Sequence, residues 1–271
     1  MESPIIDFHA HVFPEDMAEK IISGLHERAG IEYFNNGTVK GLLESMEDAG
    51  VNISVVSRIA TRADQIKSVN DWLLSISREN IIPMATWHPE LRVYPGTVRE
   101  LKLKGFKCIK LHPDYQGFFI DDERMFPFYE DAQEGGMPIL FHAGLDRGLP
   151  PPVRALPERL INVHQTFPDL KIIAAHMGGE DNYEATEDYL LGKSIYLDTS
   201  FVLRKMPVNI LGRLIKGHSA DRIIFGSDSP WNDQKGDIEY LSSLSFLSSE
   251  EKRNIFYRNA AELLGLDLSQ Q

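Results

Sequence analysis

Histidines and a carboxylate at strand-like spacing are the residues of this chain with the clearest chemical potential. His9 and His11 are separated by one residue, so in an extended strand their imidazoles lie on the same face. His142, His176 and Asp228 each end a later apolar run. Neutral imidazole nitrogen and carboxylate oxygen suit Zn²⁺, with Mn²⁺, Fe²⁺ and Ni²⁺ as alternatives. A His-x-His pair alone is a weak motif, but these positions together predict a metal site.

The strands that must position these side chains are predicted from eight short apolar runs that end in polar residues. The runs cover residues 4–9, 51–59, 81–88, 105–112, 138–142, 171–176, 194–200 and 222–228. Segments with helical spacing lie between several of them, at 63–78, 125–134, 157–167 and 206–216. This alternation is typical of a parallel (β/α)8 barrel, and no glycine-rich nucleotide-binding turn follows a run. We therefore expect one α/β domain over residues 1–271, a (β/α)8 TIM barrel.

The first strand carries two of the histidines, and the segment that follows it is unusually long. Alternation along this strand predicts that His9 and His11 face the barrel axis, with Ile6, Phe8 and Ala10 toward the helices. The long segment predicts an insertion after the first strand, with a loop at 32–37 that is either a lid over one end of the barrel or plain surface.

Composition limits the partners of the chain. The formal net charge is −12, with no cluster of basic residues, which argues against binding nucleic acid or an anionic membrane. A single cysteine, Cys108, excludes an intramolecular disulfide and a cysteine-built metal cage. No signal peptide and no run long enough to span a membrane is found, so we expect a cytoplasmic protein that acts on a small molecule.

The motifs of the chain resemble those of a known family over nearly its whole length. They are the segments at 6–11, 105–113, 138–144, 175–179, 225–230 and 259–264. They resemble the amidohydrolase superfamily, and more closely its amidohydrolase-related group, which includes aminocarboxymuconate-semialdehyde decarboxylase-like proteins. The resemblance implies that His9, His11 and His142 bind the metal. It also implies that Asp228 is both a ligand and a proton acceptor, and that His176 holds a second metal or polarises the substrate.

Lys110 leaves the number of metals open. The resemblance implies either a carboxylated lysine that bridges two metals or, as in mononuclear relatives, a free ammonium that faces an anionic substrate. A solvated surface position is the plain alternative. His112 shares the predicted inward face of Lys110 and is a further candidate for a second metal or for the substrate. Cys108 lies deeper in the same strand and is expected in the core.

The favoured activity at this stage is hydrolysis. A metal-activated water would attack the carbonyl of an amide, ester or lactone, with Asp228 moving the proton and His176 or the metal stabilising the oxyanion. Asp7 is expected to orient its neighbours by hydrogen bonds. A catalytically inactive metal-binding barrel is a further alternative, but every expected ligand position is filled.

The main alternative is a lyase that decarboxylates an aromatic or unsaturated acid. The carboxylate of this acid would be held by Lys110, Arg58 or Arg62. The plain alternative for the two arginines is that they are surface charges. Further residues could line the substrate pocket, although Trp87 also suits core packing. They are Trp87, His88, Tyr115 and Trp231. A homodimer is an expectation from the architecture alone.

Overall fold

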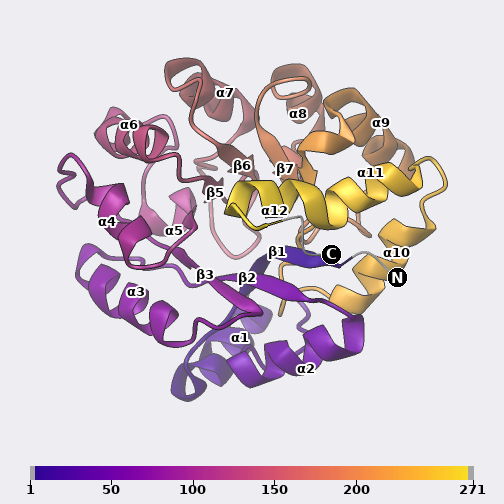
Figure 1. Ribbon diagram of the computed structural model, residues 1–271, viewed down its shortest axis with the longest axis horizontal. Coiled ribbons are helices and arrows are strands. Elements are labelled where there is room, and N and C mark those ends of the chain that lie inside the picture. Colours follow the sequence, from indigo (N-terminus) through magenta and orange to yellow (C-terminus); the bar gives the residue numbers. More distant parts are fainter. Residues whose placement is uncertain (1–3, 268–271) are drawn as a thin grey trace.

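The predicted (β/α)8 barrel is confirmed by a computed structural model that describes residues 4–267 (Figure 1). Eight parallel strands follow one another around the sheet in chain order. They are β1 (Ile6–His11), β2 (Ile53–Ser57), β3 (Ile81–Ala85), β4 (Cys108–Leu111), β5 (Ile139–Phe141), β6 (Ile172–Ala174), β7 (Tyr196–Asp198) and β8 (Ile223–Ile224). The barrel is closed by contacts between its first and last strands, where the Phe8 amide donates to the Phe225 carbonyl at 2.9 Å.

Helices surround the barrel and cover its amino-terminal end (Figure 1). They are α1 (Glu15–Ala29), α2 (Val39–Ala49), α3 (Ile66–Ser75), α4 (Thr97–Leu103), α5 (Pro113–Gln116), α6 (Phe126–Gly135), α7 (Pro157–Thr166), α8 (Tyr183–Tyr189), α9 (Val208–His218), α10 (Gln234–Ser243), α11 (Ser249–Arg253) and α12 (Asn259–Leu264). The local sequence determines where several of these helices begin. The Thr38 side chain caps α2 by accepting from the Gly41 amide, and Ser248 and Glu251 form a capping box on α11.

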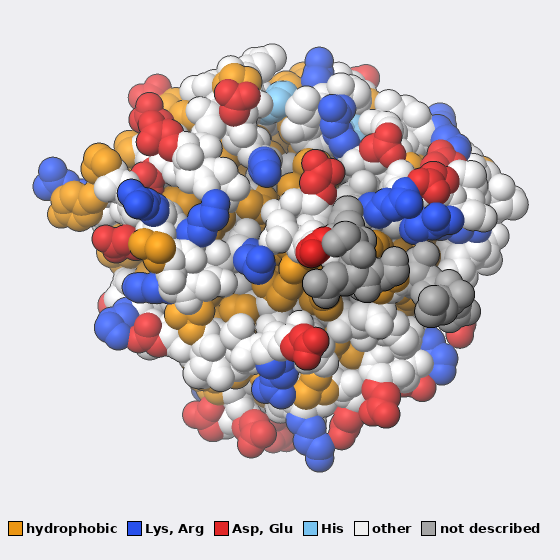
Figure 2. Space-filling view, viewed as in Figure 1, with side chains coloured by type: hydrophobic (Ala, Val, Ile, Leu, Met, Phe, Trp, Pro, Cys, Tyr) orange, Lys and Arg blue, Asp and Glu red, His pale blue; other side chains and the backbone are white. Residues whose placement is uncertain are grey.

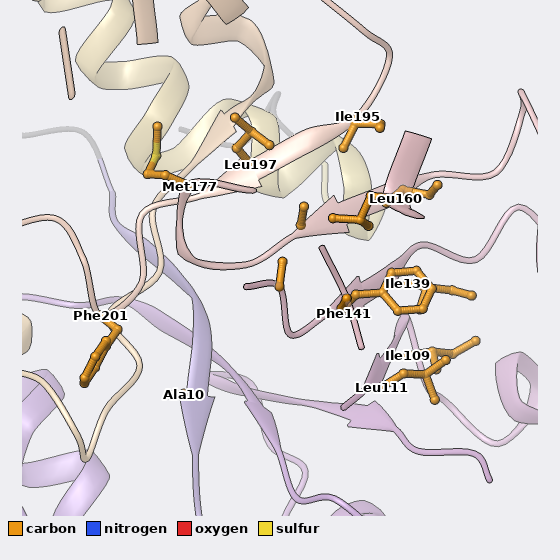
Figure 3. Close-up of a cluster of buried hydrophobic side chains, with 14 of the residues drawn as sticks. Ala10, Ile109, Leu111, Ile139, Phe141, Leu160, Met177, Ile195, Leu197 and Phe201 are labelled. Atoms are coloured by element: carbon orange, nitrogen blue, oxygen red, sulfur yellow. The ribbon is translucent and has the colours of Figure 1, made fainter. Parts of the chain in front are cut away.

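Two buried apolar clusters hold the layers together. The outer cluster fills the space between strands and helices, where Ile139, Phe141 and Leu160 pack together (Figure 3). The inner cluster fills the lower barrel, where Phe8, Cys108 and other strand residues meet Ala261 and Leu264 of α12. Apolar burial of this kind is the main favourable term in folding. The inner cluster also confirms that Cys108 is a core residue.

The expected alternation along β1 is wrong for two residues. Ile6 and Phe8 lie in the inner cluster rather than toward the helices, whereas Ala10 lies in the outer cluster as predicted. The cause is a β-bulge, because the pairing with β2 shifts by one residue between Asp7 and Ala10. The extra residue allows Phe8 to fill the barrel while His9 still faces its interior.

The insertion after β1 is mainly a helix, which the sequence analysis did not predict. The loop expected at 32–37 is present, but α1 precedes it and α2 is the helix that leads to β2. Helix α1 starts after Pro14 without a side-chain cap, but Glu15 and Asp16 in its first turn favour the positive end of the helix dipole. Ala18 and Ile22 are its buried residues. The barrel thus has an additional helix between its first strand and its first regular helix.

No helix within the described range is long and apolar enough to cross a membrane. Figure 2 shows acidic and basic side chains interspersed over the face covered by α12, without a concentrated basic patch on that face.

Candidate metal centre and active site

Three of the four predicted ligands come together at the carboxyl ends of β1 and β8. One side-chain atom from each of His9, His11 and Asp228 lies within 4.8 Å of the other two. Asp228 Oδ1 is 3.1 Å from His11 Nε2 and 3.4 Å from His9 Nε2. Burial alone would raise the pKa of Asp228, but its hydrogen bond with His11 and the nearby imidazoles hold that pKa well below its usual range. Asp228 is therefore ionised and available as a ligand.

The remaining ring nitrogens of both histidines are occupied. His9 Nδ1 lies 2.8 Å from Asp198 Oδ2, and His11 Nδ1 lies 3.2 Å from the Ser57 hydroxyl. Asp198 can only accept, so the proton of His9 is assigned to Nδ1 and the lone pair of Nε2 faces Asp228. A carboxylate behind a histidine is the usual support of a metal-binding imidazole.

Asp198, at the end of β7, is a site residue that the sequence analysis missed. Besides His9, it accepts from the backbone amides of His176 and Ser200, at 2.9 and 3.0 Å, and from the Ser200 hydroxyl. Its side chain is fully buried. Burial favours a raised pKa, but the contact with His9 dominates and keeps the pKa of Asp198 well below its usual range. The only sequence signal for Asp198 is its position at the end of a strand. Aspartate is so common that this position alone does not make it stand out.

His142 lies in the same pocket but in a second group of potential ligands. It groups with His112 and with Asp146, which was also missed. The His112 and His142 rings are stacked, with centroids 4.1 Å apart, and His112 Nε2 is 3.1 Å from Asp146. His142 Nε2 is buried and has no hydrogen-bond partner among residues 4–267. An unpartnered buried nitrogen is costly unless another group, such as a cation, satisfies it.

His176 joins the two groups. Its Nδ1 lies 3.1 Å from the Ser200 carbonyl, and its Nε2 lies 3.0 Å from His142 Nδ1. Because a carbonyl only accepts, the proton is assigned to His176 Nδ1, and His142 Nδ1 donates to His176 Nε2. The chain of hydrogen bonds leaves the lone pair of His142 Nε2 free.

Lys110 lies at the floor of the site and is not a solvated surface charge. Its side chain is 1% exposed, and its Nζ is 2.8 Å from His9 Nε2. Burial lowers the pKa of Lys110 to about 8, with Asp198 and Asp228 acting in the opposite direction. Lys110 forms no ion pair with a carboxylate in the part of the chain that the structure describes. Its charge is thus directed at the pocket.

Asp7 links the two strands that carry the first group. It accepts from the amides of His9 and Ser227, at 3.1 and 2.9 Å, and from Gln234 Nε2 at 2.7 Å. Burial raises the pKa of Asp7 to about 6, although these hydrogen bonds oppose the shift. The orienting role predicted for Asp7 agrees with these contacts.

The two groups of potential ligands, together with His176 and Lys110, line a cavity of about 330 Å³. Arg58, Tyr115 and Trp231 line it as predicted. Trp87 and His88 are not among the described lining residues, so their assignment to the pocket is corrected. Trp87 stacks on the Phe128 ring, with centroids 5.1 Å apart, which is core packing.

The position of Arg62 is also settled by its contacts. Arg62 is 66% exposed and pairs with Asp64 at 3.0 Å. It is therefore a surface charge rather than a substrate clamp.

The residues present fit a divalent cation. Two imidazoles with supported Nδ1 atoms face one ionised carboxylate, and a third imidazole has a buried lone pair without a partner. Nitrogen and oxygen donors of this kind suit Zn²⁺ and Mn²⁺.

Comparison with known proteins identifies the family. No curated protein matches the chain. An uncharacterized TIM-barrel protein from Bordetella bronchiseptica has a TM-score of 0.76 at 19% identity, covering 97% of this chain and 98% of that one. The 5-carboxyvanillate decarboxylase from Sphingomonas paucimobilis has a TM-score of 0.71 at 13% identity, covering 98% and 100%. A dihydroxybenzoic acid decarboxylase from Polaromonas sp., solved with bound manganese and 2-nitroresorcinol, has a TM-score of 0.72 at 19% identity, covering 97% of each chain. These likenesses show a shared fold, and the match of residues 6–266 to the amidohydrolase family model shows that the chain belongs to that family.

Proposed function

We propose that the protein is a metal-dependent decarboxylase of a small aromatic or unsaturated carboxylic acid. The observation that carries this proposal is the buried Lys110 ammonium at the floor of the pocket, which lacks a carboxylate partner in residues 4–267. A buried cation needs a compensating anion, and a substrate carboxylate supplies one. The two decarboxylases with the same fold support this choice over the hydrolysis favoured by the sequence.

The reaction replaces the carbon–carbon bond to the carboxylate by a carbon–hydrogen bond and releases CO₂. The metal, held by His9, His11 and Asp228 with His142 adjacent, would polarise substrate oxygens as a Lewis acid. Lys110 positions the carboxylate by charge. His176 lines the pocket but has both ring nitrogens engaged, by the Ser200 carbonyl and by His142, so it holds His142 in place. The proton that joins the carbon in place of CO₂ would come from a solvent water molecule in the pocket.

Hydrolysis is the second candidate, and the ionised Asp228 favours it. Its carboxylate lies within the ligand group, 3.1 Å from His11 Nε2, where it can accept a proton from a water molecule. The same residues would then act on the carbonyl of an amide, ester or lactone, and Lys110 would hold a substrate anion away from the reacting bond.

The test measures metal content and both reactions on one preparation. Elemental analysis should find one metal for each chain, which we expect to be Zn²⁺ or Mn²⁺, and Lys110→Ala should leave this number unchanged. A panel of hydroxybenzoates, assayed for CO₂ release, should contain a substrate whose turnover Lys110→Ala lowers by at least tenfold. Turnover of lactones, esters or amides without CO₂ release from any acid would overturn the proposal. A second metal that is lost in Lys110→Ala would assign Lys110 as a bridging ligand and also overturn it.

A further inference from the structure

One wall of the pocket is apolar and comes from the inserted helix α1. Met17, Ile21 and Leu25 line the cavity, and their spacing of four places them on one face of the helix. None of the three is fully buried, and Met17 is 38% exposed. Ala18 and Ile22 are buried residues of the same helix. Helix α1 therefore has one wide apolar stripe, of which one edge packs within the protein and the other is open to the pocket, where it suits an apolar part of a ligand.

An arginine with an available charge lies against this wall. Arg58 lines the cavity, and its Nη2 lies 3.4 Å from the Met17 sulfur. Its guanidinium is 5.6 Å from the centroid of the Trp72 ring on α3, so the side chain extends toward the helices. It forms no ion pair within the described residues.

Another arginine of the pocket differs in this respect. Arg147 also lines the cavity, but it pairs with Glu180 at 2.6 Å and with Asp181 at 3.1 Å. Its charge is already balanced. Of these two arginines, Arg58 is the one placed to bind a ligand carboxylate.

The cations that line the pocket are Arg28, Arg58, Lys110 and Arg147, and two of them, Lys110 and Arg58, lie in different surroundings deeper than the exposed Arg28. Lys110 contacts His9 at the polar floor, whereas Arg58 contacts Met17 on the apolar wall. We propose that the substrate is an amphipathic dicarboxylic acid. One carboxylate binds at the floor beside Lys110, the apolar body lies along Met17, Ile21 and Leu25, and the second carboxylate pairs with Arg58. This inference rests on the proposed function in one respect, which is the choice of the carboxylate that is lost in the reaction.

Binding of three unreacted probes tests the proposal on the metal-loaded protein. The probes are benzoate, 4-propylbenzoate, and 4-(2-carboxyethyl)benzoate, which adds a distal carboxylate to a chain of similar length. Calorimetry should show 4-propylbenzoate binding about tenfold more tightly than benzoate, because its propyl group is removed from water. The diacid should bind about tenfold more tightly again, because it forms a charge-assisted pair.

Matched variants separate the two parts of the site. Arg58→Gln should weaken the diacid by about tenfold and leave 4-propylbenzoate unchanged, whereas Arg62→Gln, at an exposed arginine outside the pocket lining, should change neither. Ile21→Ser should weaken both substituted probes but not benzoate. Thermal unfolding of each variant verifies that it is folded.

Two outcomes would overturn the inference. If Arg58→Gln weakens benzoate as much as the diacid, Arg58 holds the floor carboxylate and no distal site exists. If 4-propylbenzoate binds no better than benzoate, the α1 wall does not receive the substrate. Neither outcome depends on CO₂ release, so failure of this inference and failure of the proposed decarboxylation are distinguishable.

Discussion

Replacement of Asp198 by asparagine gives a direct test of how the metal site is built. The new side chain would have nearly the same shape as the aspartate, but its amide nitrogen only donates. Oδ1 of Asp198 receives the His176 amide and both donors of Ser200, while Oδ2 faces His9 alone. The amide oxygen should therefore take the Oδ1 position, with the NH₂ group facing His9 Nδ1.

This substitution should move the proton of His9 to the wrong nitrogen. Nδ1 must then accept, so Nε2 carries the hydrogen and loses the lone pair that faces Asp228. Loss of such support typically weakens metal binding by about 10- to 100-fold, which corresponds to about 1.4–2.7 kcal/mol. Three of the four hydrogen bonds to residue 198 remain, so Asp198→Asn should lose about 1.5–3 kcal/mol of stability and still fold.

The assay is competition for Zn²⁺ or Mn²⁺ against a chromophoric chelator, combined with urea denaturation. Asp131→Asn is the matched control, because Asp131 is also buried and accepts from the Gly96 and Val98 amides away from the metal site. The control should lose stability and keep its metal Kd. A metal Kd for Asp198→Asn within twofold of the unmodified protein would refute the assigned tautomer.

Further predictions concern three other residues. Asp228→Asn should abolish most turnover and weaken metal binding without unfolding the chain, and a variant with nearly full activity would contradict the role of Asp228. The Cys108 thiol is fully buried, and burial raises its pKa to about 12, so Ellman's reagent at pH 8 should label it only after unfolding. Rapid labelling of the folded protein would contradict this burial. The raised pKa of Asp7, about 6 against 3.8, means that the folded state binds more protons between these values. Stability should therefore fall by about 3 kcal/mol as pH rises from about 4 to 6, and this slope should be missing in Asp7→Asn. Urea denaturation at several pH values measures this dependence. If stability changes equally with pH in the unmodified protein and in Asp7→Asn, Asp7 does not titrate between these pH values.

The strands and most residues of the candidate metal site were predictable because their signals are local. Short apolar runs separated by helical segments specify a barrel, and histidine is rare enough that its position at several strand ends is informative. Asp198 and Asp146 carry no such signal, since the chain has 40 acidic residues. Their roles depend on which strands are neighbours, and this is a property of the closed barrel.

Helix α1 and the bulge in β1 were missed for different reasons. The apolar residues of α1 recur at helical spacing along one stripe that includes Met17, Ala18 and Ile22, so this signal was present in the sequence and was overlooked. The bulge adds one residue without a change in composition, and only the pairing with β2 reveals it. Strict alternation therefore assigned Phe8 to the wrong side.

The bulge also separates two tasks within one strand. Phe8, within the bulge, belongs to a sealed apolar layer, whereas His9 and His11 face the pocket. Side chains of the pocket can be exchanged without repacking the apolar layer, so new reactions can arise on a scaffold whose stability is set elsewhere. Deletion of one residue between Asp7 and Ala10 would remove this independence, because any shift that restored pairing would turn either the histidines or the phenylalanine to the wrong side.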